Sequence, residues 1–508
     1  MKKQLLKLFC LILPALFLTG CWQEELPEEV SSLVQPGEEK TEERAAAPLP
    51  ESFSLPYAPD QPLEPTSCPD GVQQTVASLL YEGLFRLGPG LEPENLLCDS
   101  YTYDAERYVY VFTLRSGVLF SDGSPLTARD VRLSLERARD SQRYGARFAQ
   151  VSSISAGEGT VTIALDRPNA AFPALLDIPI TKGDGDVPAG TGPYLLSEDE
   201  TGFFLSANPA WWQGGGQPVD RINLAEASGQ DATLYRFTSH EVQLIAADLT
   251  GASPVALTGS VDLWDADTAV LQYIGCNTAV PPLDSAALRR ALGEGINREQ
   301  IVSGFLSGHG RAAQFPVSPA SRLYPEGLET RFSADAMSRA VSESGYVPER
   351  TLTLLVNEEN SFKVSAATYL AESFTAAGVP AETRILPWEE YTAALLEGDF
   401  DLYYGEVRLT ADWDLSPLLS TGGALNYGGW ADARTDELLA SCSSAADRTA
   451  AMESLCTHLR QQQPILPVCF KSTSVLAQSG VLENLTPTAA EPFYNLTGCS
   501  IHLLENGK

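Results

Sequence analysis

Strands and helices alternate in the second half of the chain, and this alternation restricts the fold more than any other feature. Three short segments are rich in strand-forming residues: Leu352–Val356, Thr383–Leu386 and Phe400–Tyr404. Helical patterns fill the two intervals, and the second of them covers Trp388–Glu397. This order of elements with short links predicts a parallel sheet covered by helices. Ligands bind just past the carboxyl ends of the strands in such sheets, so the residues directly after Tyr404 are the first candidates for a site.

The first half of the chain also mixes both kinds of element, which makes the whole an α/β protein. Strand patterns cover Phe53–Tyr57, Tyr108–Leu114 and Val161–Leu165. An apolar stripe predicts a helix from about Gly71 to Phe85, with Asp70 as its N-cap. A second helix is expected to begin at Thr127 and Asp130, which have the spacing of a capping box.

The amino-terminal segment has the pattern of a targeting signal. Basic residues at Lys2 and Lys3 precede an apolar run from Leu8 to Leu18, which is too short for a permanent transmembrane helix. The run ends in Leu18-Thr19-Gly20-Cys21, which resembles a bacterial lipobox. In such signals the cysteine carries a diacylglycerol and becomes the mature amino terminus. We therefore predict a signal peptide at 1–20 and a lipid anchor at Cys21. An ordinary secretory signal with an incidental cysteine is the alternative.

The amino-acid composition predicts an extended spacer after Cys21 and argues against a nucleic-acid partner. Residues 21–51 are rich in glutamate and proline and poor in apolar residues, so we expect an extended spacer between lipid and folded body. The formal net charge of the chain is -32, which repels nucleic acid, and we expect no nucleic-acid partner. Seven cysteines follow Cys21 without a C-x-x-C pair, and their spacing leaves the number of disulfides open.

Several sequence blocks together resemble one known family. The blocks are Leu80–Phe85, Phe112–Val131, Gly190–Tyr194, Asn208–Trp212, Leu288–Leu292, Ile296–Glu299, Asn426–Trp430 and Asp436–Leu439. In this order they resemble the family 5 extracellular solute-binding proteins of ABC importers, which bind oligopeptides, dipeptides or nickel complexes. The resemblance spans about Phe53 to Ser500. We expect the turns, caps and bends among these blocks to define the scaffold, and Arg289, Arg290 and Arg298 to be solvated or salt-bridged.

The resemblance implies a fold and a set of partners. The fold would be the type II periplasmic-binding-protein fold, with two main lobes joined by a hinge and an extra subdomain. Lobe I would combine 52–70, 190–275 and 470–508, lobe II would be 71–189, and lobe III would be 276–469. The main lobes would close over the ligand. A peptide or small solute, the permease subunits of an ABC importer and the membrane are the implied partners. We expect a monomer on the outer face of the cell membrane, on the periplasmic side in a Gram-negative cell, with no cofactor.

The resemblance also implies an aspartate that receives the ammonium group of a peptide. Ala411-Asp412-Trp413 resembles the Ala-Asp-Tyr of the family, which makes Asp412 the candidate. Such a contact contributes about 1.5–3 kcal/mol. Asp414 competes for this role, and a loop or capping role for Asp412 is the alternative. Trp413 is a candidate for stacking on a ligand side chain, although buried tryptophans more often belong to the core.

Four further residues complete the candidate ligand contacts. Many peptide-binding members have Gly-Trp just before the triplet, whereas this chain has Glu406 and Arg408 nearby. In the cleft wall these charges would favour a charged or zwitterionic ligand, with Arg408 offering a fork to a carboxylate. Mutual neutralisation is the alternative. Tyr57 and Asp60 lie where the first strand of lobe I would enter the cleft.

Three rival functions stay open. No Gly-x-Ser-x-Gly, phosphate loop or His-Glu-x-x-His argues for an enzyme. Four scattered histidines and three methionines make a protein-ligated metal a weaker hypothesis, although a metal chelate can be held without protein ligands. A peptide-sensing lipoprotein without transport would use the same fold.

Overall fold

The computed structural model describes residues 49–251 and 260–504. All of them belong to one compact unit that begins at Ala47. The predicted signal peptide at 1–20, the lipidation site Cys21 and the predicted tether up to residue 48 lie outside the described residues. Within the described ranges, no helix combines the length and the apolar character that a membrane crossing requires.

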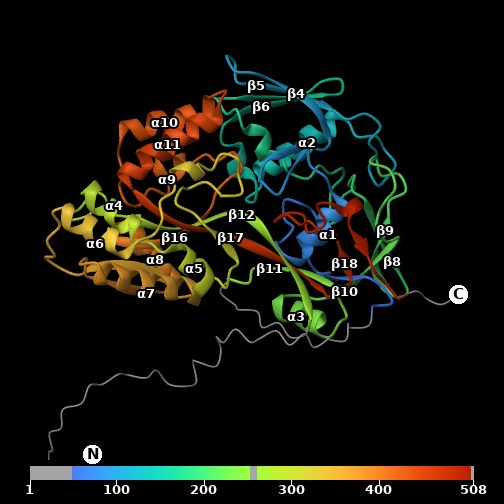
Figure 1. Ribbon diagram of the computed structural model, residues 1–508. Helices are drawn as coiled ribbons and strands as arrows, with labels where there is room; N and C mark the ends of the chain where they lie inside the picture. Colours follow the sequence, from blue (N-terminus) through green and yellow to red (C-terminus); the bar gives the residue numbers. More distant parts are fainter. Residues whose placement is uncertain (1–48, 252–259, 505–508) are drawn as a thin grey trace, which may run out of the picture. The chain divides into compact units, whose positions relative to one another are not determined.

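Three larger sheets form the framework of this unit (Figure 1). The first has the strand order β1 (Ser54–Tyr57), β10 (Arg221–Glu226), β9 (Gly202–Ala207) and β8 (Tyr194–Asp199). The second is antiparallel, with the order β4 (Cys98–Asp104), β5 (Val109–Leu114), β7 (Thr160–Leu165) and β6 (Val151–Ala156). The third has seven strands, in the order β11 (Leu244–Ala247), β17 (Ile465–Gln478), β12 (Val261–Cys276), β16 (Leu402–Arg408), β14 (Leu352–Asn357) and β15 (Ala381–Leu386), with β13 (Gly310–Ala312) beside β17.

Helices and two strand pairs complete the described part of the chain. The pairs are β2 (Phe85–Leu87) with β3 (Pro93–Asn95) and β18 (Leu482–Glu483) with β19 (Ser500–Ile501). The helices are α1 (Val72–Leu80), α2 (Ala128–Asp140), α3 (Gln230–Thr238), α4 (Ala286–Glu294), α5 (Arg298–Phe305), α6 (Ala334–Glu343), α7 (Ser361–Ala376), α8 (Trp388–Glu397), α9 (Ser416–Leu419), α10 (Ala433–Ser444) and α11 (Arg448–Gln462).

The predicted parallel strands are confirmed within the seven-stranded sheet. Strands β15 and β16 both run parallel to β14, and α7 and α8 connect them as the sequence pattern predicts. The sheet as a whole is mixed, because β12 runs antiparallel to both β16 and β17. Strands β12 and β17 are long, at 16 and 14 residues, and each crosses the boundary predicted between lobe I and lobe III. The division into lobes itself stays a prediction.

The end of β16 differs from the prediction. The sequence pattern ended this strand at Tyr404, but the strand continues to Arg408. Its extra residues pair with β12, where Glu406 lies opposite Gln272 and Arg408 opposite Val270. Strand β12 supplies hydrogen-bond partners for the backbone N–H and C=O groups of this charged segment. The segment therefore stays in a strand although its side chains no longer alternate between apolar and polar. Glu406 and Arg408 are therefore strand residues, and the loop begins later.

The first helix is shorter than predicted and has a different cap. It ends at Leu80 rather than near Phe85, because the carbonyl of Leu80 accepts a hydrogen bond from the N–H of Gly192 and Tyr81 is already extended. Gly71 occupies the N-cap position without a side-chain bond. Asp70, the predicted cap, instead pairs with Arg143 at 2.5 Å. The predicted capping box of α2 is confirmed in full.

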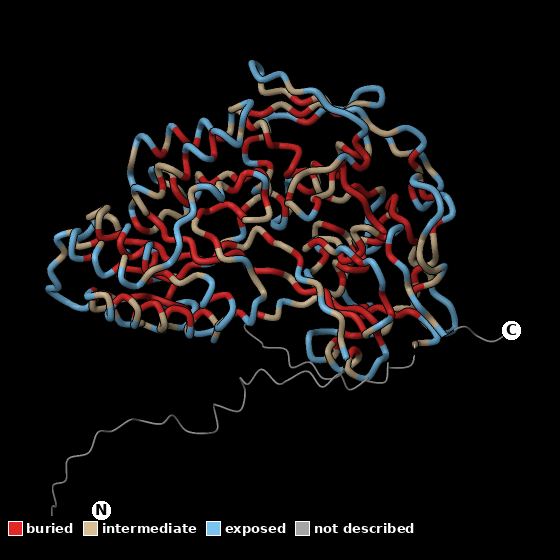
Figure 2. The backbone as a smooth tube through the Cα atoms, in the orientation of Figure 1, coloured by how far each residue is buried: buried red, intermediate tan, exposed pale blue. Residues whose placement is uncertain are grey.

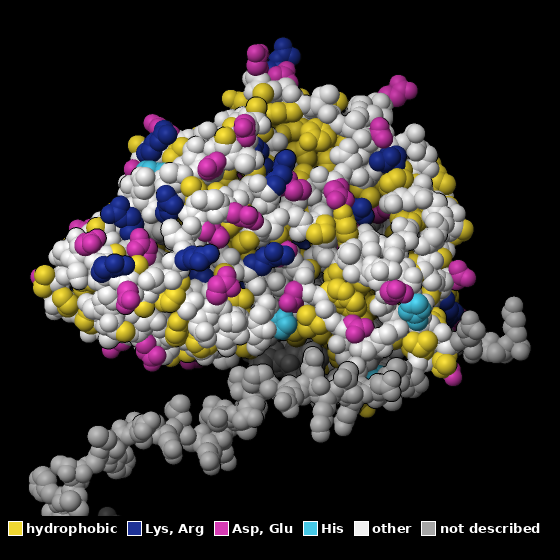
Figure 3. Space-filling view, in the orientation of Figure 1, with side chains coloured by type: hydrophobic (Ala, Val, Ile, Leu, Met, Phe, Trp, Pro, Cys, Tyr) yellow, Lys and Arg dark blue, Asp and Glu magenta, His cyan; other side chains and the backbone are white. Residues whose placement is uncertain are grey.

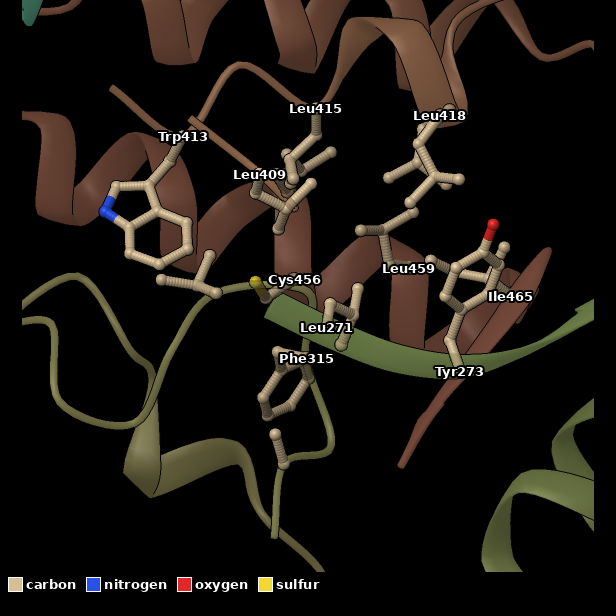
Figure 4. Packing of buried hydrophobic residues seen from close by; sticks show 14 of the residues in the cluster. Leu271, Tyr273, Phe315, Leu409, Trp413, Leu415, Leu418, Cys456, Leu459 and Ile465 are labelled. Atoms are coloured by element: carbon tan, nitrogen blue, oxygen red, sulfur yellow. The ribbon is translucent and has the colours of Figure 1, made fainter. Parts of the chain in front are cut away.

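The core lies on both faces of the seven-stranded sheet. Successive side chains of a strand point to opposite faces, so Tyr403 packs with α8, α10 and α11, while Tyr404 packs with α4 and α7. The buried trace in Figure 2 follows the sheet between these helices, with α7 on one side and α11 on the other (Figure 1). Figure 4 shows part of the first face, where Leu271 of β12 lies against Cys456 and Leu459 of α11.

Charged side chains of both signs mix on the surface. On the face drawn in Figure 3, acidic and basic groups alternate and form no single acidic patch. This face therefore presents no single acidic docking surface.

Candidate functional site

Asp412 lies in the loop after β16 and is buried. Only 5% of its surface is exposed. Its Oδ2 accepts a hydrogen bond from Asn169 Nδ2 at 2.8 Å, and its backbone carbonyl accepts one from Arg448 Nη2 at 2.5 Å. Asn169 follows β7 of the second sheet, 243 positions away in the chain. The fold thus places this carboxylate where two segments that are distant in the chain meet.

Burial controls the charge of this carboxylate. Desolvation raises the pKa of Asp412, and the negative charge of Asp414 raises it further. Hydrogen bonds from Thr410 and Asn169 act in the opposite direction. In the described residues no ion pair reaches the carboxylate, although Arg448 is near enough to attract it. A buried acid with hydrogen bonds but no bonded cation is well suited to receive a cationic group.

A small cavity lies directly beside Asp412. Its lining residues are Gln150, Arg167, Asn169, Asp412, Trp413, Asp414, Leu415, Leu439, Cys442 and Ser443. It measures about 10 Å³, close to the space that one water molecule needs. The backbone N–H of Ala170 donates to the carbonyl of Ser443 at 2.8 Å, which closes the segments over it. The cavity as it stands has no room for a ligand larger than about one water molecule.

Trp413 and Asp414 also line this cavity, and their roles in ligand binding stay predictions. Trp413 is buried and packs edge-on against Phe470, with 6.0 Å between ring centroids. Its indole nitrogen lies on the side away from Leu409 and Leu271 (Figure 4) and has no hydrogen-bond partner among the described residues. Asp414 Oδ2 lies 3.4 Å from Arg167 Nη2, and its Oδ1 accepts from the N–H of Ser416 at the start of α9.

Glu406 and Arg408 lie apart from the cavity and do not neutralise each other. Glu406 Oε2 accepts from Gln272 Nε2 at 2.9 Å and lies 3.9 Å from Lys471 Nζ. Arg408 is exposed, and no ion pair joins it to Glu406 in the described ranges. The structure therefore shows no ion pair by which Glu406 and Arg408 would neutralise each other.

Tyr57 and Asp60 contact neither Asp412 nor Glu406. Tyr57 is buried against Phe203 in the first sheet, and burial raises the pKa of its hydroxyl. Asp60 is exposed and accepts a hydrogen bond from the hydroxyl of Ser228 at 3.2 Å. Their role in ligand binding stays a prediction.

Sequence reasoning missed the residues that meet Asp412 from other elements. Asn169 and Arg167 stand in the segment Arg167-Pro168-Asn169, shortly after the predicted strand Val161–Leu165, and Arg167 contacts Asp414 beside Asp412. Arg448 opens α11, and burial lowers the pKa of its guanidinium. The only available signal was a polar residue directly after a strand end, which is also typical of ordinary turns.

Metal-binding and disulfide chemistry have little support in the described ranges. No group of three or more His, Cys, Asp or Glu side chains there is arranged to hold a metal ion. All seven cysteines between Cys68 and Cys499 are buried and unpaired.

Comparisons with known proteins identify the family. The family model described as bacterial extracellular solute-binding proteins, family 5 Middle, matches residues 92–426. The glutathione-binding protein GsiB of Salmonella typhimurium is 27% identical over 388 residues, which cover 71% of this chain and 75% of GsiB. Among solved structures, the periplasmic murein tripeptide-binding protein MppA, in its unliganded open form, has a TM-score of 0.74 at 19% identity and covers 90% of this chain and 99% of its own.

Another solved structure with this fold carries a different name. The structure of a nickel ABC transporter protein from Bacillus halodurans has a TM-score of 0.73 at 18% identity, and the match covers 87% of this chain and 98% of that one. At such identities the likeness shows the fold alone, which is the predicted type II periplasmic-binding-protein fold. Because the family model matches most of the chain, this protein belongs to the family 5 extracellular solute-binding proteins of ABC importers.

Proposed function

We propose that this protein is anchored by a lipid at Cys21 on the outer face of the cell membrane, captures peptides and delivers them to an ABC importer. The observation that carries the peptide assignment is Asp412, a buried carboxylate at a contact between distant segments that has no bonded cation among the residues that the structure describes. The ammonium group of a peptide would supply the missing charge and would favour the ionised acid. In this proposal Asn169 and Arg448 hold the carboxylate in place.

The names of related proteins support a peptide over a metal. GsiB is named for glutathione and MppA for a murein tripeptide, and both ligands contain amino-acid units. The nickel protein of Bacillus halodurans keeps a metal chelate as the second candidate. The acid beside the cavity favours a cationic group, and the described residues offer no cluster of metal ligands.

A thermal-shift assay tests the proposal directly. The chain from Trp22 onward retains the whole compact unit that begins at Ala47, and it would be mixed with a pool of random peptides of two to five residues. Ligand at 100 times its dissociation constant adds about 2.7 kcal/mol to stability. A clear rise in the unfolding midpoint supports peptide binding. If the peptide pool does not raise the unfolding midpoint of protein verified to be ligand-free, but nickel–histidine complexes do, the result would support the metal-chelate candidate.

Asp412→Asn is expected to weaken binding of peptides with a free amino terminus at least tenfold. The substitution keeps the shape and the bond to Asn169 but removes the charge that the ammonium group requires, and such a contact is worth about 1.5–3 kcal/mol. The stability of the ligand-free protein should be equal or higher, because burial already disfavours the ionised acid. Calorimetry with the peptide pool measures the affinity, and urea titration measures the stability.

Asp414→Asn is the matched control for this variant. Asp414 is two positions away, lines the same cavity and is paired with Arg167. Its substitution should leave the affinity within about twofold. If Asp414→Asn loses the binding and Asp412→Asn keeps it, the ammonium role belongs to Asp414.

Cys21→Ala is expected to release the protein from membranes. The predicted diacylglycerol on Cys21 is the proposed anchor, and alanine has no thiol to carry it. Cell fractionation followed by immunoblotting measures the distribution, with Cys10→Ala as the control because Cys10 precedes the predicted cleavage point. Continued membrane retention of Cys21→Ala would show that the lipobox prediction is wrong.

A further inference from the structure

The tip of the β2–β3 hairpin, residues 88–92, places one leucine in a core to which the rest of the hairpin does not belong. Phe85 before the tip and Leu97 after it pack in the cluster of the second sheet. Leu91 is 7% exposed and belongs instead to the cluster on one face of the seven-stranded sheet, which also contains Phe315. Within the described part of the chain, Leu91 is the only member of that cluster from the first half of the sequence. The tip therefore connects two cores that are otherwise built from separate parts of the chain.

The loop after β13 is the seat of this tip. Glu92 Oε1 accepts a hydrogen bond from Ser321 Oγ at 3.4 Å and lies 3.3 Å from Arg322 Nε. A Cβ atom on Gly90 would lie 3.3 Å from the carbonyl oxygen of Ala320, so the two backbones approach closely there. Apolar burial, one ion pair and this close approach together hold the tip on the loop.

The contact is small, and part of it is strained. Leu91 has a φ of 60°, in the left-handed region that is unfavourable for leucine. Both polar contacts of Glu92 are long for hydrogen bonds, and the side chain of Arg322 is 72% exposed. One leucine and one exposed ion pair supply most of the attraction. Such a contact can be released while both sheets stay folded.

The hairpin and Asn169 belong to one packed unit. The ring of Phe85 in β2 packs edge-on against Phe112 of β5, with 5.8 Å between ring centroids. Tyr110, also in β5, is fully buried and donates from its hydroxyl to the carbonyl of Asn169 at 2.7 Å. A displacement of Asn169 away from Asp412 would therefore displace the tip as well.

Glu92 also acts on the group that holds the Asp412 loop. Arg448 donates to the backbone carbonyl of Asp412. Burial lowers the pKa of the Arg448 guanidinium, and the negative charges of Asp412 and Glu92 act in the opposite direction. The tip of the hairpin thus lies within electrostatic range of the residue that is bonded to the candidate site.

The cavity beside Asp412 measures about 10 Å³, which is too small for a peptide. We infer that the tip of the β2–β3 hairpin is a releasable clasp, which keeps this cavity closed while it is seated on the loop after β13. Binding of a peptide at Asp412 requires Asn169 to move away, and the tip leaves its seat in the same movement. This inference rests on the proposed peptide-binding function.

A reversible crosslink tests the inference on the chain from Trp22 onward. Glu92→Cys and Arg322→Cys are combined, and their thiols are joined in ligand-free protein by a short bismaleimide with a central disulfide. Equilibrium dialysis against random peptides of two to five residues measures the affinity. The crosslinked protein should bind at least tenfold more weakly than the same protein after a reducing agent has cleaved the linker. Equal affinity before and after cleavage overturns the inference alone. Absence of the crosslink also overturns it, because these positions are in contact while the tip is seated.

Controls separate the possible failures. Arg434→Cys combined with Glu437→Cys is the matched pair, because these exposed residues form an ion pair within α10. The same linker there restrains a single helix and should leave the affinity unchanged. An unfolding midpoint of the crosslinked clasp variant at or above that of its cleaved form shows that weak binding does not come from unfolding. Failure of the untreated wild type to bind the peptides overturns the proposed function as well.

Discussion

Glu82→Ala is expected to lower the free energy of unfolding by about 3–5 kcal/mol. The carboxylate of Glu82 is 6% exposed and accepts four hydrogen bonds, from the indole nitrogens of Trp211 and Trp212, the hydroxyl of Thr191 and the amide of Gln213. Alanine would leave these donors without an acceptor and open a cavity. Each buried unsatisfied group costs about 1–3 kcal/mol, and partial relaxation keeps the sum below the simple total.

Urea titration of ligand-free protein measures this loss, with Glu158→Ala as the matched control. Glu158 lies in an exposed turn between two glycines, so its removal should change stability by less than about 0.5 kcal/mol. Glu82→Gln should fall between the two variants, because an amide oxygen still accepts bonds but the amide nitrogen meets donors. An Ala variant as stable as the wild type would show that water satisfies the four donors and that Glu82 is dispensable.

Glu82 also joins three sequence blocks that are separate in the chain. Glu82 comes from the Leu80–Phe85 block, Thr191 from the Gly190–Tyr194 block and the two tryptophans from the Asn208–Trp212 block. A side chain at Gly190 would lie 2.1 Å from the carbonyl oxygen of Leu80, so only glycine permits this approach. The expectation that these blocks define the scaffold agrees with their positions in the structure.

The strands of the α/β region were predictable because their signal is local. Alternation and β-forming residues gave β5, β7 and β14 to within one residue at each end, and α8 has its predicted bounds. The continuation of β16 to Arg408 was not predictable, because it depends on pairing with β12, which lies more than a hundred residues earlier. Glu406 and Arg408 belong to the strand because their backbones pair with β12, and not because their side chains are buried in the core. Their sequence therefore shows no alternation of apolar and polar residues that would predict a strand.

The candidate site was predictable only in the segment that carries Asp412. Its neighbours Trp413 and Asp414 line the same cavity, because three consecutive residues of a loop stay together. Asn169 and Arg448 were missed, since each reaches its position through long-range topology and neither has a local pattern that separates it from a turn or helix residue. Burial of a polar side chain is the informative observation, and it exists only in the fold.

Arg289 shows the same limit most clearly. The expectation that Arg289 is solvated or salt-bridged is wrong: Arg289 is 2% exposed and has no ion pair within the described ranges. Its guanidinium instead donates to the backbone carbonyls of Leu283, Asp284, Gln462 and Gln463. Two of these carbonyls belong to the end of α11, where a helix leaves carbonyl groups unsatisfied. One side chain thus caps a helix that lies far away in the chain.

Arg289→Met is therefore expected to destabilise the ligand-free protein by about 3–5 kcal/mol. Methionine fills much of the space but leaves buried carbonyls at the end of α11 and before α4 without donors, and breaking a buried charged contact costs this much. Arg290→Met is the control, because Arg290 is the next residue of α4, is exposed and carries the same charge. Urea titration of both variants should separate them by at least about 3 kcal/mol. Equal stability would mean that water replaces the guanidinium at these carbonyls. A large loss confined to Arg289→Met would assign the residue to the scaffold, where it joins α4 to the end of α11 just before β17 enters the sheet.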